Sequence, residues 1–158
     1  MALIVVTVSV CVLLVLITTG IHLGTMQGMV RRAPGWLKRH KLRIPALVLA
    51  AIGAHLLEIV VFAAGLSWLD QIKDMGTLVS DSPIGFHDYV YYSAVTFSTL
   101  GFGDIVPTGH LRLVTMTESL TGLVLVAWTA SALFLVMQHD WTRRSQSEQD
   151  SDQSRANQ

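Results

Sequence analysis

The chain has 158 residues, of which 51% are apolar and 14% charged, and its formal net charge is zero. Soluble domains of this length carry more charge, and a balanced charge argues against a nucleic-acid partner, which would need a basic surface. The single cysteine, Cys11, excludes an intrachain disulfide and a cysteine-based metal cluster.

Three apolar stretches are each long enough to cross a bilayer, which takes about 20 residues. Residues 1–24 contain no Asp, Glu, Lys or Arg, and residues 44–69 contain one acid, Glu58. The third stretch covers residues 111–137. Because no basic residue precedes the first stretch, a retained helix is favoured over a cleaved signal peptide. The sequence therefore predicts an all-α membrane protein with three transmembrane helices.

The segment that joins the first two helices, residues 25–43, is basic and contains no acid. Positively charged loops stay in the cytoplasm, so we expect a multi-pass plasma-membrane protein with its N-terminus outside and residues 70–85 in an external loop. The polar tail, residues 138–158, would be cytoplasmic and disordered. The basic residues of the joining segment could alternatively bind anionic lipid; they are Arg31, Arg32, Lys38, Arg39, Lys41 and Arg43.

A segment of a different kind lies between the second and third helices. Residues 86–98 predict a helix that is too short to span a bilayer, with Asp88 in its first turn. The six residues that follow read Thr99-Leu100-Gly101-Phe102-Gly103-Asp104. Irregular backbone at membrane depth is stable only where it is buried in protein or lines a water-filled path, so a re-entrant loop is expected.

The residue types at positions 99–104 suit the binding of a dehydrated cation. Rings of backbone carbonyls can replace the water shell of such an ion. Aiming successive carbonyls to one side requires positive φ at intervals, and glycine adopts positive φ without steric penalty. Gly101 and Gly103 meet this requirement, while the hydroxyl and carbonyl of Thr99 could close the inner end of the site.

The Thr-Leu-Gly-Phe-Gly-Asp sequence, with Pro107 and the flanking apolar helices, resembles the signature of small prokaryote-type potassium channels of the pore-loop ion-channel family. The similarity runs from about Tyr91 to Met137. It implies a homotetramer with a pore domain over residues 44–137, made of an outer helix (44–69), a pore helix (86–98), a selectivity filter (99–104) and an inner helix (111–137). The resemblance implies that K⁺ binds at Thr99, Leu100, Gly101 and Phe102.

The sequence departs from the family pattern behind the filter. Leu100 and Phe102 stand where the family often has Val and Tyr, so Phe102 has no hydroxyl to brace the filter. Val95 occupies the position of a pore-helix acid that in related channels faces the filter Asp. We therefore predict that Tyr91 donates a hydrogen bond to Asp104 and supports the filter.

Gly122, in the third helix, matches a glycine at which inner helices of this family often bend. A glycine inside a helix costs about 1 kcal/mol relative to alanine, so some structural reason is expected. A hinge and close packing against the pore helix are both open. If the register holds, the apolar residues that line the inner cavity are Leu123, Val126, Ala130 and Phe134.

Two acids, Glu58 and Glu118, lie inside predicted transmembrane helices, where acids are read as functional by default. His55 is one helical turn from Glu58 on the same face. Glu58 and Glu118 lie at similar depths, so the three residues could form a buried polar cluster. This cluster would be structural, or it would serve as a protonation-sensitive gate or attract cations.

A passive, potassium-selective homotetrameric channel is the function that these features predict. A weakly selective cation channel, a subunit of a potassium transporter and a non-conducting accessory subunit are the alternatives. No cofactor is expected apart from K⁺ as the permeating ion. The histidines at positions 22, 40, 55, 87, 110 and 139 are scattered and form no ligand-spaced pair, so an enzyme is not predicted.

Overall fold

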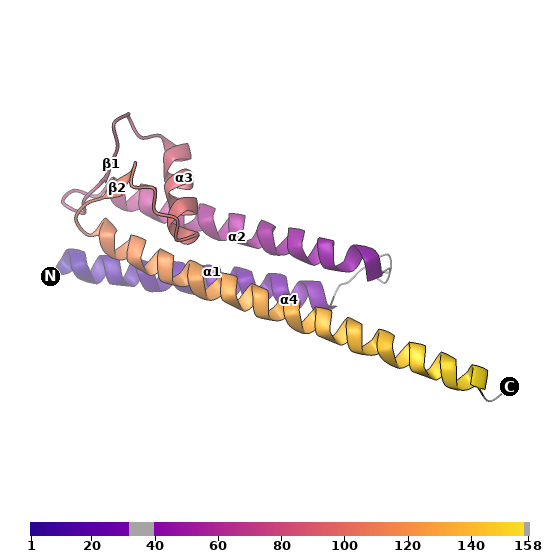
Figure 1. The fold of residues 1–158 in the computed structure, drawn as a ribbon. Helices are drawn as coiled ribbons and strands as arrows, with labels where there is room; N and C mark the ends of the chain where they lie inside the picture. Colours follow the sequence, from indigo (N-terminus) through magenta and orange to yellow (C-terminus); the bar gives the residue numbers. More distant parts are fainter. Residues whose placement is uncertain (32–39, 157–158) are drawn as a thin grey trace.

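Residues 1–31 and 40–156 are described by the computed structural model, and they are mostly helical (Figure 1). The elements are helices α1 (Ala2–Arg31), α2 (His40–Asp70), α3 (Phe86–Phe97) and α4 (Leu111–Ala156) and strands β1 (Leu78–Val79) and β2 (Val106–Pro107). Three helical segments are long and apolar enough to cross a membrane: Ala2–Gly28, Ile44–Asp70 and Leu111–Gln138. The predicted fold class is confirmed.

The long helices α1, α2 and α4 lie side by side, and the short helix α3 lies at one end of them (Figure 1). Both α1 and α2 extend further into the basic segment than the sequence suggested, and α2 carries Pro45 inside it. Residues 32–39 lie outside the described residues, as do the side chains of Arg31, Lys41 and Arg43. The lipid-binding prediction for this segment therefore stays a prediction.

The polar tail differs from its expected disorder. Instead of ending near residue 137, α4 continues as a helix to Ala156. The residues added after Met137 up to Ala156 include four Gln and three Arg, which are good helix formers, beside four Ser and three Asp, which are weaker ones, and they contain neither Gly nor Pro. Extending an existing helix avoids the cost of nucleating a new one, so a polar sequence can follow an apolar one.

The hydrophobic core lies where α1, α2 and α4 meet the connecting segments. Its fully buried members include Phe62, Leu66 and Leu69 of α2 and Leu111 of α4. Helix α1 packs closely on α2, because a Cβ atom at Gly65 would lie 2.8 Å from Leu14 Cδ1. The first helix is thus an integral part of this core.

The connections on either side of α3 are fastened to each other. Strands β1 and β2 are antiparallel, with Leu78 opposite Pro107. Next to them, Gly76 has a φ of 100°, and a Cβ atom there would lie 2.2 Å from the Thr108 carbonyl oxygen. Only glycine tolerates both the conformation and the contact. This junction fixes both ends of the segment that contains α3 and residues 99–104.

Candidate functional site

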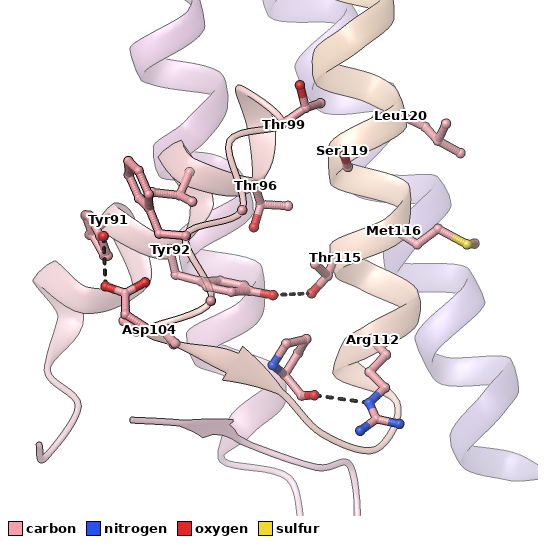
Figure 2. A pocket seen from close by; sticks show the side chains of 16 residues that line it. Tyr91, Tyr92, Thr96, Thr99, Asp104, Arg112, Thr115, Met116, Ser119 and Leu120 are labelled. Carbon is pink, nitrogen blue, oxygen red and sulfur yellow. Dashed lines mark hydrogen bonds between the residues drawn. The ribbon is translucent and has the colours of Figure 1, made fainter. Parts of the chain in front are cut away.

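Helix α3 is held by polar contacts to both neighbouring helices. Its N-terminus is capped by Asp88, whose carboxylate accepts a hydrogen bond from the Gly85 N–H at 2.7 Å. Ser93 donates to the Ile59 carbonyl of α2 at 2.8 Å and is also hydrogen-bonded to Glu118 of α4. Tyr92 Oη lies 2.9 Å from Thr115 Oγ1 of α4 (Figure 2). Helix α3 is therefore fixed in position relative to α2 and α4.

The C-terminal end of α3 rests directly on Gly122. A Cβ atom at this position would lie 2.2 Å from the Phe97 carbonyl oxygen and 3.0 Å from Phe97 Cγ. This contact provides the reason for a glycine inside α4, and it matches the close-packing interpretation. The hinge interpretation concerns a motion and stays a prediction.

Residues 99–104, which we call the candidate filter, follow the C-terminal end of α3. Along them, positive φ angles recur at every second residue. The φ angles of Thr99, Gly101 and Gly103 are 60°, 60° and 81°. Positive φ at every second residue is what the carbonyl-ring argument requires. Thr99 was not expected to share it, because positive φ is strained in a β-branched residue. The Thr99 N–H donates a hydrogen bond to the Thr96 carbonyl at 3.0 Å, and the Leu100 N–H donates one to the Val95 carbonyl at 2.9 Å. These two hydrogen bonds stabilise the turn at the end of α3.

The predicted bond behind the candidate filter is confirmed. Tyr91 Oη donates to Asp104 Oδ2 at 2.8 Å (Figure 2). The hydrogen bond to Asp104 raises the pKa of the exposed Tyr91. A second tyrosine of α3, Tyr89, donates to Asp70 at the end of α2. Burial, followed by this hydrogen bond, raises the pKa of Tyr89. Both hydroxyls therefore keep their protons at neutral pH.

A hollow of about 710 Å³ separates the candidate filter from the first turns of α4 (Figure 2). Leu100 and Phe102 are 62% and 66% exposed as whole residues. Large apolar side chains that are this exposed form an apolar surface that a single chain leaves in contact with its surroundings, as at sites of protein–protein contact. Residues that line the hollow include Tyr92, Thr96, Phe102, Thr115 and Ser119.

The buried acids belong to two separate networks. Glu118 is fully buried and hydrogen-bonded to Ser93, and its Oε2 atom has no partner among the described residues. Glu58 is also fully buried, and its Oε2 atom lies at a hydrogen-bond distance of 2.8 Å from His55 Nδ1, as the helical spacing predicts. No hydrogen bond in the described part of the chain joins Glu58 to Glu118. Each acid instead fastens a different pair of helices.

The sequence interpretation missed His22. This fully buried residue of α1 places its Nδ1 atom 3.0 Å from Glu58 Oε1. The interpretation of the histidines as scattered is therefore wrong for His22 and His55, which meet at one carboxylate. The sequence did contain an indication of its importance, because a histidine inside an apolar, membrane-spanning stretch is expected to have a polar partner.

Comparison with known proteins gives two findings. Residues 54–139, more than half of the chain, match a family described as "Ion channel". A stretch of 59 residues is 36% identical to YdjJ, an uncharacterized membrane protein of Bacillus subtilis (strain 168). This stretch covers 37% of the present chain and 17% of that relative. The family match contains α3, the candidate filter and most of α4, but not α1.

Proposed function

Because this chain belongs to the ion channel family, we propose that it forms a potassium-selective channel whose filter is residues 99–104. The observation that carries this proposal is the alternation of positive φ at Thr99, Gly101 and Gly103. An alternating backbone can turn successive carbonyls toward one side and so replace the hydration shell of a cation. Potassium ions would bind to the backbone oxygens of Thr99, Leu100, Gly101 and Phe102.

The active unit is a homotetramer. One chain supplies one wall of the proposed filter, and a cation needs oxygens on all sides. The exposed side chains of Leu100 and Phe102 would be covered by neighbouring copies. On α4, the residues expected to face an inner cavity are exposed in the single chain: Leu123, Val126, Ala130 and Phe134. Together these surfaces give each copy an apolar face around a central axis.

The position of α3 supports cation binding electrostatically. Its C-terminal end lies at Phe97, directly before the candidate filter. The carbonyl end of a helix carries a partial negative charge, which attracts a cation. In the proposed channel, four such ends would face the ion at the inner end of the filter. The attraction of cations would then depend on the close contact between the C-terminal end of α3 and Gly122.

We place the channel in the plasma membrane with the candidate filter toward the outside. In this orientation the N-terminal end of α1 is external, and the basic segment and the polar end of α4 are cytoplasmic. The excess of Lys and Arg between α1 and α2 supports this orientation. The same segment would meet anionic lipid headgroups at the inner surface.

The test compares a Gly→Ala substitution in the candidate filter with one inside helix α2. Gly101 and Gly53 each have nothing within 4 Å of an added Cβ atom, but only Gly101 has a positive φ, of 60°. Purified protein is reconstituted into liposomes, and ⁸⁶Rb⁺ uptake is driven by an outward potassium gradient. We expect Gly101→Ala to abolish uptake and Gly53→Ala to leave it unchanged.

The alternatives give different results in the same assay. Equal sodium and potassium flux through the parent protein would favour a weakly selective cation channel. Flux that requires a second driving ion would favour a transporter subunit. Absence of flux in well-folded parent protein would favour an accessory subunit. Uptake that is equal in the two Gly→Ala variants would overturn the assignment of residues 99–104 as the filter.

A further inference from the structure

Three ligand-type side chains from two helices converge inside the membrane-spanning part of the chain. His22 Nδ1 lies 3.0 Å from one oxygen of Glu58, and His55 Nδ1 lies 2.8 Å from the other. The three ligand atoms that the residues offer lie within 4.8 Å of one another. His22 and Glu58 are fully buried, whereas the His55 side chain is 17% exposed and leaves one approach open.

Charge makes this cluster incomplete as it stands. A carboxyl group that is fully removed from solvent either takes up a proton or, as a carboxylate, pairs with a positive charge or a metal ion. Among the described residues, the groups that bond Glu58 are the imidazoles of His22 and His55, and no Lys or Arg side chain is paired with it. Neutral imidazoles supply no charge, so either a proton or a metal ion must balance the Glu58 carboxylate.

The contacts of the two imidazole rings with Thr129 also favour a metal ion, because they limit where the ring protons can lie. Its Oγ1 atom lies 3.1 Å from His55 Nε2 and 3.4 Å from His22 Nε2. If both neutral rings donate from Nδ1 to Glu58, both Nε2 atoms are acceptors, and the single Thr129 hydroxyl proton can serve only one. If a metal ion occupies both Nδ1 atoms, each ring carries its proton on Nε2. Thr129 then accepts both bonds with its two lone pairs.

We propose that His22, His55 and Glu58 bind a divalent transition-metal ion of the zinc class. Two histidines and one glutamate are a known zinc ligand set, with metal–ligand bonds of about 2.0–2.2 Å. A tetrahedral arrangement of such bonds separates ligand atoms by roughly 3.3 Å. The distances of 3.0 and 2.8 Å, which join the two Nδ1 atoms to different oxygens of Glu58, would widen by a few tenths of an ångström. The three ligand atoms, which lie within 4.8 Å of one another, would adjust to a single ion through side-chain rotation. Thr129 would orient the two rings, as outer partners of zinc-bound histidines commonly do.

The site assigns a role to the first helix. Glu58 and His55 lie inside the family match, residues 54–139, whereas His22 is outside it on α1. A bound ion would tie α1 to α2, and the contact with Thr129 would extend this tie to α4. Because binding of an ion to the folded chain favours that state, metal should raise the thermal stability of the assembly.

The experiment uses the full chain, purified in detergent without a polyhistidine tag and freed of metal with a chelator. Cobalt(II) is titrated while its visible d–d absorption is recorded, and zinc content is measured after dialysis. We expect one ion per chain, displacement of cobalt by zinc, and a melting temperature that rises with zinc and falls again with chelator. His22→Gln should lose binding at least tenfold, and so should Glu58→Gln.

Two further variants separate the site from other causes. His87→Gln is the matched control, because the His87 side chain is 86% exposed, and it should bind metal like the parent. Thr129→Val keeps all three ligands and should weaken binding by about 10–100-fold without changing the stoichiometry; this result stands even if His22→Gln fails to fold. Absence of binding by the parent would overturn the proposal and assign the missing charge to a proton. Equal binding by the parent, His22→Gln and Thr129→Val would also overturn it.

Discussion

Substitution of Gly122 by alanine probes how the candidate filter is held in place. The added Cβ atom would lie 2.2 Å from the Phe97 carbonyl oxygen and 2.9 Å from its carbonyl carbon. Even a close carbon–oxygen contact is about 3.3 Å, so α3 and α4 must separate locally by roughly 1 Å. The obstacle is backbone rather than a flexible side chain, and it lies immediately before residues 99–104.

Two opposing effects set the magnitude of the stability change. Overpacking a close contact typically costs about 1–3 kcal/mol. Replacing glycine with alanine inside a helix contributes about 1 kcal/mol in the opposite direction. We therefore expect Gly122→Ala to lower the free energy of unfolding by up to about 2 kcal/mol. Potassium flux should fall more steeply, because a shift of about 1 Å in a functional constellation is enough to impair it.

The assay pairs thermal unfolding in detergent with liposome flux for Gly122→Ala and Gly53→Ala. Gly53 also lies inside a helix, but an added Cβ atom there meets nothing within 4 Å, so only the favourable helix term should appear. A Gly122→Ala protein that gains stability as Gly53→Ala does and conducts normally would refute the close-packing account. Raised stability with altered opening would instead support a hinge.

Two predictions concern the tyrosines of α3. Tyr91→Phe removes the donor to Asp104 and should change single-channel conductance or inactivation while the fold persists, because the bond is exposed; unchanged recordings would show that the bond does not support the filter. Tyr89 has its pKa raised in the folded chain from the ordinary value of 10.0 by burial and by Asp70. Above about pH 10 only the unfolded chain would release this proton, so stability should fall with rising pH. Tyr89→Phe should show a shallower alkaline loss, measured by thermal unfolding between neutral pH and pH about 11; identical slopes would contradict the assignment.

The sequence was sufficient where a local pattern determines the structure. Three long apolar stretches predicted the three candidate spans, and Gly101 and Gly103 indicated the alternating backbone. The His55–Glu58 bond followed from the spacing of one helical turn, and the Tyr91–Asp104 bond followed from the resemblance to the channel family. In each case the residues involved lie close in the chain or on one helix face.

Features that depend on contacts between distant segments could not be predicted in the same way. His22 meets Glu58 across 36 positions and Thr129 across 107, and nothing in either helix specifies their relative rotation. Their similar depth in the membrane suggested that Glu58 and Glu118 could be neighbours, but depth does not determine which side of a helix faces which partner. The tail was expected to be disordered from its polarity alone, whereas the absence of Gly and Pro and the continuity with α4 allow the helix to extend.

The most direct test of the central claim is the reversal potential of the reconstituted channel between potassium on one side and sodium on the other. If residues 99–104 form a potassium filter, current should reverse far from zero voltage, in the direction set by the potassium gradient, and Gly53→Ala should reverse at the same voltage. A reversal potential near zero in the parent protein would mean that potassium and sodium permeate equally, and would contradict the account.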